Sequence, residues 1–198
     1  MELKRVVITG LGAITPLGNT KDETWEALKA GKSGCGPITL FDASKHKTFF
    51  ACEVKGFNVN DYIDRKEARK LDRFAQFAMV AAEEGIKDSG LDLEQEDKTK
   101  IGVVVASGIG GLSTFEEEVM GYDKERGPRF NPFFIPKMIS DIAAGHISMK
   151  YGFHGPNYST ASACASSTNA LIDAAHLIRL GKANVIIAGG AEASICAA

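Results

Sequence analysis

The sequence predicts an α/β fold with a buried, mostly parallel sheet. Strand-like and helix-like segments alternate along the chain, and two runs, 101–106 and 185–188, are apolar almost without interruption. Alternating segments favour a sheet with helices packed on its faces, and continuous apolar runs are typical of strands buried on both faces. The 198 residues are enough for one domain with a substantial core.

The expected strands are short segments rich in β-branched and apolar residues, bounded by turn-forming residues. They cover residues 5–9, 48–54, 101–106, 158–161 and 184–188. The first strand runs into Gly10 and the third into Ser107-Gly108. Glycine turns are therefore expected where these two strands end.

Three segments have the apolar spacing of amphipathic helices. They cover residues 22–30, 65–85 and 169–180. The second is the clearest, because apolar side chains recur every three or four positions from Leu71 to Ile86. We expect this helix to be continuous and to bury its apolar stripe against the sheet.

The stretch from residue 108 to 157 follows neither pattern. Glycine and proline interrupt it, and it carries an aromatic cluster at Phe130, Phe133 and Phe134. We expect an irregular excursion from the sheet rather than a separate domain. Acidic side chains dominate residues 83–97, which indicates a solvated loop.

Composition excludes several classes of protein. With 23 basic and 25 acidic side chains the formal charge is -2, which provides no general attraction for nucleic acid or an anionic membrane. No apolar run approaches the roughly 18 to 20 residues that a membrane-spanning helix needs. The four cysteines and four histidines are scattered and match no zinc motif, so no metal site is expected. Scattered cysteines without an export signal fit a reducing compartment, and we expect a cytoplasmic protein.

Two glycine clusters follow expected strands. Residues 9–12 suggest a dinucleotide-binding loop, but Thr15 stands where that fingerprint needs its third glycine. We therefore expect a tight turn in which backbone passes close to backbone. Residues 107–111 lack the Lys-Ser/Thr ending of a phosphate-binding loop. This cluster either lets the backbone line a pocket, with Ile109 as an apolar wall, or forms an ordinary turn.

Cys164 lies between an expected strand and an expected helix, and hence at a strand-to-helix turn. The positive end of a helix dipole favours a reactive thiolate, and unpaired N–H groups there can stabilise an oxyanion. The neighbouring side chains are small, which leaves room for a substrate. Most single cysteines in α/β proteins are buried apolar side chains, so a nucleophile and a structural cysteine are both open interpretations.

The residues do not identify a proton-transfer partner for Cys164. His146 and His154 are close to it in sequence, but nothing directs either ring at the thiol. His176 falls inside an amphipathic helix and is expected to be structural.

Five basic side chains gather on one short stretch, at Arg65, Lys66, Arg69, Lys70 and Arg73. Glu67 and Asp72 offset two of them, which leaves a net charge of +3. Such a stretch is either a solvated helix face or a surface that steers an acidic partner.

Several motifs together resemble the β-ketoacyl-acyl-carrier-protein synthases, the type II enzymes more than type I. Residues 6–19 resemble the opening of this family, and residues 131–136, 145–146 and 151–152 are similar to its central region. Ala163-Cys164-Ala165-Ser166 resembles the nucleophile motif, and residues 188–192 resemble the strand beyond it. The similarity covers the whole chain and keeps its order, which is more specific than any single motif.

The resemblance implies a thiolase-like layered α/β fold. Residues 1–198 would form one half of a duplicated architecture with five-stranded mixed sheets, and the full-length enzyme would be a homodimer. Cys164 would accept an acyl chain from acyl carrier protein, with its backbone N–H as one oxyanion donor. An enolate, formed by decarboxylation of malonyl carrier protein, would then attack the thioester. No cofactor is implied.

The resemblance also assigns binding roles. Ile109 and Phe134 would line the acyl pocket. The basic side chains that would receive the acidic carrier protein are Arg65, Lys66, Arg69 and Lys70.

The two catalytic histidines and the supporting lysine of the family belong to a second half whose motifs are absent from this sequence. We therefore expect residues 1–198 to be the amino-terminal half of a condensing enzyme, inactive alone. The presence of Cys164 disfavours a chain-length-factor relative, which lacks it. Two alternatives stay open: a non-catalytic protein that binds a carrier protein or dimerises, and a coenzyme A thiolase-like enzyme. The basic stretch and the opening motif count against the thiolase.

Overall fold

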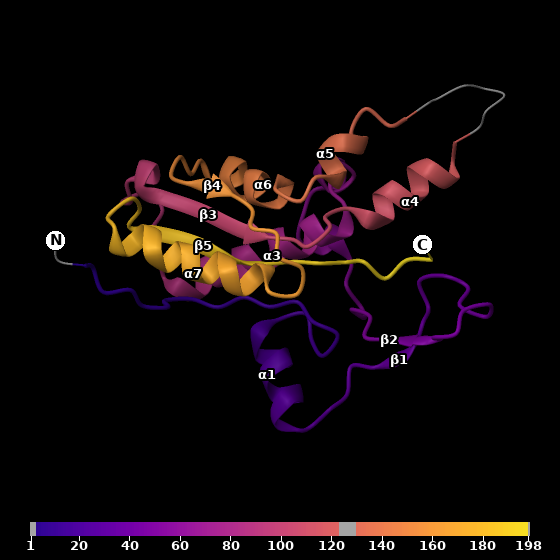
Figure 1. Cartoon of the computed structure of the whole chain (residues 1–198). Helices are drawn as coiled ribbons and strands as arrows, with labels where there is room; N and C mark the ends of the chain where they lie inside the picture. Colours follow the sequence, from indigo (N-terminus) through magenta and orange to yellow (C-terminus); the bar gives the residue numbers. More distant parts are fainter. Residues whose placement is uncertain (1–2, 123–129, 198) are drawn as a thin grey trace.

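An α/β/α sandwich forms the body of the protein (Figure 1). The structure, a computed structural model, describes residues 3–122 and 130–197. The central sheet has the order β4-β3-β5, with bounds Asn157–Tyr158, Ile101–Ala106 and Val185–Gly190, and both pairings are parallel. Helices α3 (Arg73–Ser89) and α6 (Ile142–Tyr151) cover one face, and α7 (Ser166–Arg179) covers the other. The predicted α/β class is confirmed.

Strand β3 is buried along its whole length. Ile101, Val103 and Val105 pack into the core with α3 and α6, whereas Val104 and Ala106 pack with Ala170 of α7. Successive side chains of a strand point to opposite faces, so both faces of β3 require apolar residues. The uninterrupted apolar run at 101–106 follows from this, and its predicted strand is confirmed.

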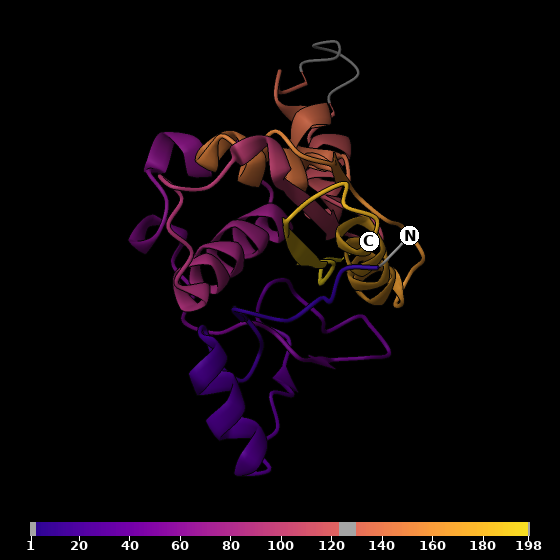
Figure 2. The ribbon, with the colours of Figure 1, turned by 90° about the vertical axis from the view of Figure 1, so that its left-hand side faces the viewer.

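The remaining elements are short. They are α1 (Lys21–Lys29), β1 (Gly36–Pro37), β2 (Phe50–Ala51), η1 (Val59–Asp61), α2 (Arg65–Ala68), η2 (Lys98–Lys100), α4 (Leu112–Met120) and α5 (Phe134–Met138). Strands β1 and β2 pair antiparallel, and with α1 they project from the sandwich (Figure 2). None of the helices in the described residues is both long and apolar enough to cross a membrane.

The predicted continuous helix over residues 65–85 is wrong, because the chain breaks it after Ala68 and restarts it at Arg73. Asp72 has an extended backbone and caps α3 by accepting a hydrogen bond from Phe74 N at 3.2 Å. The Gln76 side chain donates to the carbonyl of Ala68 and so satisfies the end of α2. The spacing of apolar residues predicts which side chains are buried, but it does not reveal a break between two helices, since the apolar spacing continues across it.

Asp72 also joins two helices. Its carboxylate is buried, and Oδ2 accepts from the backbone N–H of Thr114 at 3.0 Å and from its hydroxyl at 2.6 Å. Thr114 lies in the first turn of α4, where backbone N–H groups have no partner within the helix. Asp72 therefore caps its own helix, α3, and also caps α4, which lies about 40 positions later in the sequence. It thus connects the core helix α3 to the segment after β3.

Residues 5–9 do not form the expected strand. They run unpaired beside the sandwich, and Val7 and Ile8 are 56% and 82% exposed. The central sheet in the described residues has three strands rather than the five that the resemblance implies. Apolar β-branched composition favours an extended chain, but strand propensity depends strongly on tertiary context and does not by itself produce pairing.

The glycines of residues 9–12 serve a close approach of backbone to backbone, as expected. A Cβ on Gly10 would overlap the carbonyl oxygen of Gly85, and one on Gly12 would overlap the carbonyl oxygen of Ala81. Both contacts are with α3. Glycine is required here because the segment lies directly on the helix backbone.

Two acidic side chains of α3 hold this amino-terminal segment in place. Glu84 accepts hydrogen bonds from the backbone N–H groups of Ala13 and Lys21, both at 2.9 Å. Asp88 accepts from Leu11 N at 2.9 Å and pairs with Lys21 Nζ at 2.9 Å. The interpretation of residues 83–97 as a solvated loop is therefore wrong in its first part, which is helical and bonded.

The stretch 108–157 differs from the irregular excursion that we expected. Its described residues contain α4, α5 and α6, and α6 contributes Ala143, Ala144 and Ile147 to the core. The small side chains in α6 resemble turn-forming sequence, and the helix is therefore not evident from the sequence. Phe130 and Phe134 stack with ring centroids 5.7 Å apart, as the aromatic cluster suggests.

The arm that carries β1 and β2 depends on a buried carboxylate. Glu53 accepts from Thr39 N at 2.9 Å, Thr39 Oγ1 at 2.7 Å and Leu40 N at 3.1 Å. Burial raises the pKa of Glu53, but the hydrogen bonds from Thr39 and Leu40 outweigh it and lower the pKa below its ordinary value. The ionised form is therefore the one that stabilises the arm.

We predict that Asp72→Ala lowers the free energy of unfolding by about 2–4 kcal/mol, since it removes two helix caps and leaves buried donors without acceptors. Equilibrium unfolding in urea measures this change. Asp64→Ala is the matched control, because Asp64 caps the four-residue helix α2 on an exposed surface. We expect the control to cost at most about 1 kcal/mol. Equal losses in the two variants would contradict the linking role of Asp72.

We also predict a pH-dependent effect of Glu53→Gln. A carboxyl whose folded pKa is lowered stabilises the protein above its unfolded pKa, near 4.3, and loses that contribution as the pH falls through the folded value. The difference in free energy of unfolding between wild type and Glu53→Gln should have its largest value at pH 7 and should shrink below about pH 4. Urea unfolding from pH 7 to 3 tests this, with the exposed Glu94→Gln as control. A difference independent of pH would refute it.

Candidate functional site

The carboxyl ends of the three parallel strands bring distant parts of the sequence together. Ser107 follows β3, Glu192 follows β5, and the turn that carries Cys164 follows β4. Parallel strands end at the same edge of a sheet, and in open α/β folds ligands bind there. This edge is therefore the candidate functional site.

Cys164 is exposed and lies in the turn between β4 and α7, as predicted. The residue before it, Ala163, has φ 51°, and among the described residues it is the one non-glycine residue with positive φ. A left-handed conformation costs an L-residue roughly 1–2 kcal/mol. The turn is thus a strained elbow that presents the thiol at the amino end of α7, which favours a nucleophile over a buried structural cysteine.

Ser166, the first residue of α7, holds this elbow closed. It is buried, and its hydroxyl accepts from Ser162 N at 2.8 Å and donates to the Ala163 carbonyl at 2.7 Å. Its own carbonyl accepts from Thr160 Oγ1 at 2.9 Å. These bonds fix the backbone on both sides of Cys164, so the surrounding structure stabilises the strained conformation. The motif around Cys164 is visible in the sequence, but this role of Ser166 is not.

The loop after β3 packs beside the elbow. A Cβ built on Gly108 would lie 3.8 Å from Ala163 Cα and 3.1 Å from Glu192 Oε2. The loop therefore passes between the cysteine turn and Glu192. Of the two interpretations of residues 107–111, this placement favours backbone lining the site.

The two residues predicted to line an acyl pocket lie on neighbouring segments. Ile109 is 59% exposed on the loop after β3. Phe134 begins α5 and stacks on Phe115 of α4, with ring centroids 6.4 Å apart. The two segments are joined by a hydrogen bond from Gly111 N to the Met138 carbonyl at 2.9 Å. The pocket itself stays a prediction.

The two histidines that are close to Cys164 in sequence, and His176, which was expected to be structural, all lie away from the elbow. His146 lies on α6 near the charges of Glu67 and Lys70, and burial lowers its pKa. His154 donates its backbone N–H to the Lys98 carbonyl, which places it at the amino end of β3, opposite to the site. His176 is exposed in the last turn of α7.

The basic stretch is divided by the break between α2 and α3. Arg65, Lys66 and Arg69 are exposed, whereas Lys70 pairs with Glu67 at 2.8 Å. Arg73 is withdrawn from this surface, because its guanidinium lies over the rings of Phe57 and Phe77, at 5.9 and 4.9 Å. The exposed positive surface is therefore carried by the turn of α2, and its role as a docking surface stays a prediction.

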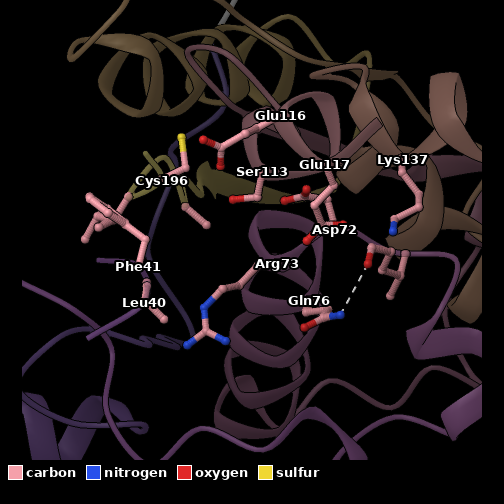
Figure 3. A pocket seen from close by; sticks show the side chains of 13 residues that line it. Leu40, Phe41, Asp72, Arg73, Gln76, Ser113, Glu116, Glu117, Lys137 and Cys196 are labelled. Atoms are coloured by element: carbon pink, nitrogen blue, oxygen red, sulfur yellow. Dashed lines mark hydrogen bonds between the residues drawn. The ribbon is translucent and has the colours of Figure 1, made fainter. Parts of the chain in front are cut away.

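A cavity of about 360 Å³ lies between the amino ends of α3 and α4. Figure 3 shows Phe41 and Cys196 on one side of it and Lys137 on the other, with Asp72 and Arg73 between them. Cys164 is not among its lining residues. The sequence does not indicate this cavity, because its walls come from five separate parts of the chain. Within residues 3–122 and 130–197, no group of three or more His, Cys, Asp or Glu side chains is placed to hold a metal ion.

Comparison with known proteins gives consistent matches over almost the whole chain. The family model for "Beta-ketoacyl synthase, N-terminal domain" matches residues 3–198. The protein named 3-oxoacyl-[acyl-carrier-protein] synthase 2 of Staphylococcus aureus (strain COL) is 45% identical over 196 residues, which are 97% of this chain and 46% of that protein. The protein of the same name from Synechocystis is 45% identical over 98% of this chain and 47% of its own length. The chain thus spans about half the length of the curated relatives it matches.

Solved structures agree with these sequence matches. The ishigamide ketosynthase/chain length factor has a TM-score of 0.85 and 26% identity, over 98% of this chain and 49% of that one. A type II PKS acyl-carrier protein in complex with its ketosynthase bound to the hexaketide (AntDE:AntF) gives a TM-score of 0.79 and 28% identity, over 94% of this chain and 50% of that one. The thiolase-like fold that the resemblance implies is supported by these ketosynthases.

We predict that Ser166→Ala lowers the free energy of unfolding by about 1–3 kcal/mol, because the Ser162 N–H and the Ala163 carbonyl lose a buried partner. Thr168→Ala, an exposed hydroxyl two positions along the same helix, should change it by less than about 0.5 kcal/mol. Urea unfolding measures both values. If Ser166→Ala costs no more than the control, the hydroxyl does not hold the elbow.

Proposed function

The chain belongs to the β-ketoacyl synthase family, and we propose that it is the amino-terminal half of a 3-oxoacyl-acyl-carrier-protein synthase that uses Cys164 as its nucleophile. The observation that carries this proposal is the strained elbow, in which a cysteine stands exposed at the amino end of α7 beside the loop after β3. Strained backbone conformations of this kind cluster at active sites, which supports a substrate role for the thiol that follows Ala163.

In the proposed reaction, the Cys164 thiol gives up its proton and attacks the thioester carbonyl of an acyl carrier protein as the thiolate. A C–S bond to Cys164 forms, the C–S bond to the carrier breaks, and the carrier leaves as a thiolate that takes up the proton released by the cysteine. The backbone N–H of Cys164 is one donor to the oxyanion. Malonyl carrier protein then loses CO₂, and the resulting enolate attacks the acyl-enzyme, so that Cys164 leaves and the chain is two carbons longer.

The acid–base groups of the second step are proposed to lie outside residues 1–198. The placement of His146, His154 and His176 supports this proposal, since a proton-transfer group must lie within hydrogen-bond reach of the reacting atoms. Ile109 and Phe134 are proposed to line the acyl pocket, because the segments that carry them are joined at Gly111.

The proposed partner is an acyl carrier protein that docks on the basic residues of the α2 turn, Arg65, Lys66, Arg69 and Lys70. Exposed cations on a protein of formal charge -2 concentrate positive potential where an acidic partner can be steered. We further propose that the full-length enzyme is a cytoplasmic homodimer. A coenzyme A thiolase-like reaction is less well supported, since the relatives carry acyl-carrier-protein names.

A non-catalytic carrier-binding or dimerising protein is the second candidate, because the chain spans about half the length of its relatives. The coding frame beyond residue 198 separates the two candidates. A downstream half with two histidines supports the synthase, and a stop codon directly after residue 198 supports the binding protein.

We predict that an acyl carrier protein thioester transfers its acyl group to Cys164 of the full-length protein, and that Cys164→Ala abolishes this transfer. Peptide mass mapping after incubation locates the acyl group. Cys35→Ala is the matched control, because Cys35 is also exposed, and it should transfer normally. An acyl group on another residue, or undiminished transfer to Cys164→Ala, would sink the proposal.

We predict that the double variant Arg69→Glu/Lys70→Glu weakens binding of acyl carrier protein by roughly tenfold or more and flattens its salt dependence, because it reverses charge on the α2 turn. Titration at 50 and 300 mM salt measures both effects, because the Debye length is much shorter at the higher ionic strength. Lys100→Glu is the control, since Lys100 precedes β3 at the end of the sheet opposite to Cys164. Equal weakening by the control would show that docking does not use this turn.

A further inference from the structure

The carboxylate of Glu192 is anchored to the loop after β3. Its Oε2 accepts from Gly108 N at 2.9 Å, from Ile109 N at 3.2 Å and from Ser107 Oγ at 3.4 Å. The other oxygen, Oε1, accepts from Ser194 Oγ at 2.7 Å. One side chain thus gathers two consecutive backbone N–H groups from a segment more than 80 positions away in the sequence.

Two of these hydrogen bonds act on the backbone of Gly108 and Ile109. The Ile109 side chain is 59% exposed, so packing restrains it little. Within the loop, the buried Ser107 hydroxyl accepts from Gly110 N at 3.0 Å. The end of the loop is tied to α5 by the hydrogen bond from Gly111 N to the Met138 carbonyl at 2.9 Å. The bonds to Glu192 tie its start, and hydrogen bonds to a carboxylate are stronger than those between neutral groups.

The loop also lies close to the cysteine elbow. A Cβ on Gly108 would be 3.1 Å from Glu192 Oε2 and 3.8 Å from Ala163 Cα. The backbone at Gly108 is therefore next to both the carboxylate and the residue that precedes Cys164. A shift of the loop away from Glu192 changes the space next to the thiol.

We propose that Glu192 is a positioning residue that sets which acyl chains reach Cys164, because it holds Ile109 at a fixed place beside the cysteine elbow. The inference rests on the proposed function, in which Cys164 carries the acyl chain. Its effect falls on the acyl group rather than on the thiol, since none of the bonds made by Glu192 involves residues 162–166.

The test compares Glu192→Ala and Glu192→Gln with the exposed Glu94→Gln in the full-length protein. One assay measures alkylation of Cys164 by iodoacetamide, and the other measures acyl transfer from carrier proteins loaded with short and long chains. For Glu192→Ala we expect alkylation within about twofold of wild type and a ratio of long-chain to short-chain transfer changed by about tenfold, the scale of a displaced positioning group. Glu192→Gln keeps one acceptor oxygen, and its ratio of long-chain to short-chain transfer should lie between those of wild type and Glu192→Ala. Glu94→Gln should give the wild-type ratio.

Loss of transfer by the same factor for all chain lengths, or a parallel loss of alkylation, would overturn the proposal and leave Glu192 a structural residue. If Glu192→Ala does not fold, the ratio in Glu192→Gln decides the question. Failure of the proposed function gives a different result, namely no acyl group on Cys164 of the wild type. In that case hydrogen exchange at residues 107–110 still tests the anchor, because unchanged exchange in Glu192→Gln would refute it.

Discussion

The parallel pairing of β3 with both β4 and β5 is the constraint on which the rest of the structure depends. It brings the residues after three strands to one edge of the sheet, although they are separated by tens of positions in the sequence. Because β3 is buried on both faces and alternates its side chains between α3/α6 and α7, its register cannot slip without exposing the core. The relative placement of Cys164, the loop after β3 and Glu192 follows from that register.

Polar side chains convert this placement into a defined geometry. Ser166 holds the cysteine elbow from inside α7, Glu192 holds the neighbouring loop from the end of β5, and Asp72 connects α3 to α4 just beyond that loop. Each of these three side chains makes hydrogen bonds to backbone groups that would otherwise have no partner. Buried or shared hydrogen bonds of this kind specify one arrangement, since the alternatives leave donors unsatisfied.

The sequence predicted the elements whose signal is local. The apolar run at 101–106 and the strand-to-helix turn at Cys164 depend on neighbouring residues, and the glycines at 10 and 12 indicate a close backbone approach without identifying its partner. Features set by distant partners were missed: the link from Asp72 to α4 depends on Thr114, and the hydrogen bonds of Glu192 are made to a loop more than 80 positions away. Residues 5–9 have strand composition, but whether they pair depends on tertiary context that composition does not encode.

In the proposed acyl site, the loop after β3 and the cysteine elbow form the two walls, and hydrogen exchange tests this arrangement most directly. The full-length protein is alkylated at Cys164 either with iodoacetamide or with an iodoacetamide that carries a long alkyl chain, and exchange is followed by mass spectrometry. We expect the long-chain adduct to protect the amides of residues 107–111 more than the small adduct does. Identical exchange of this loop in the two adducts would contradict the account.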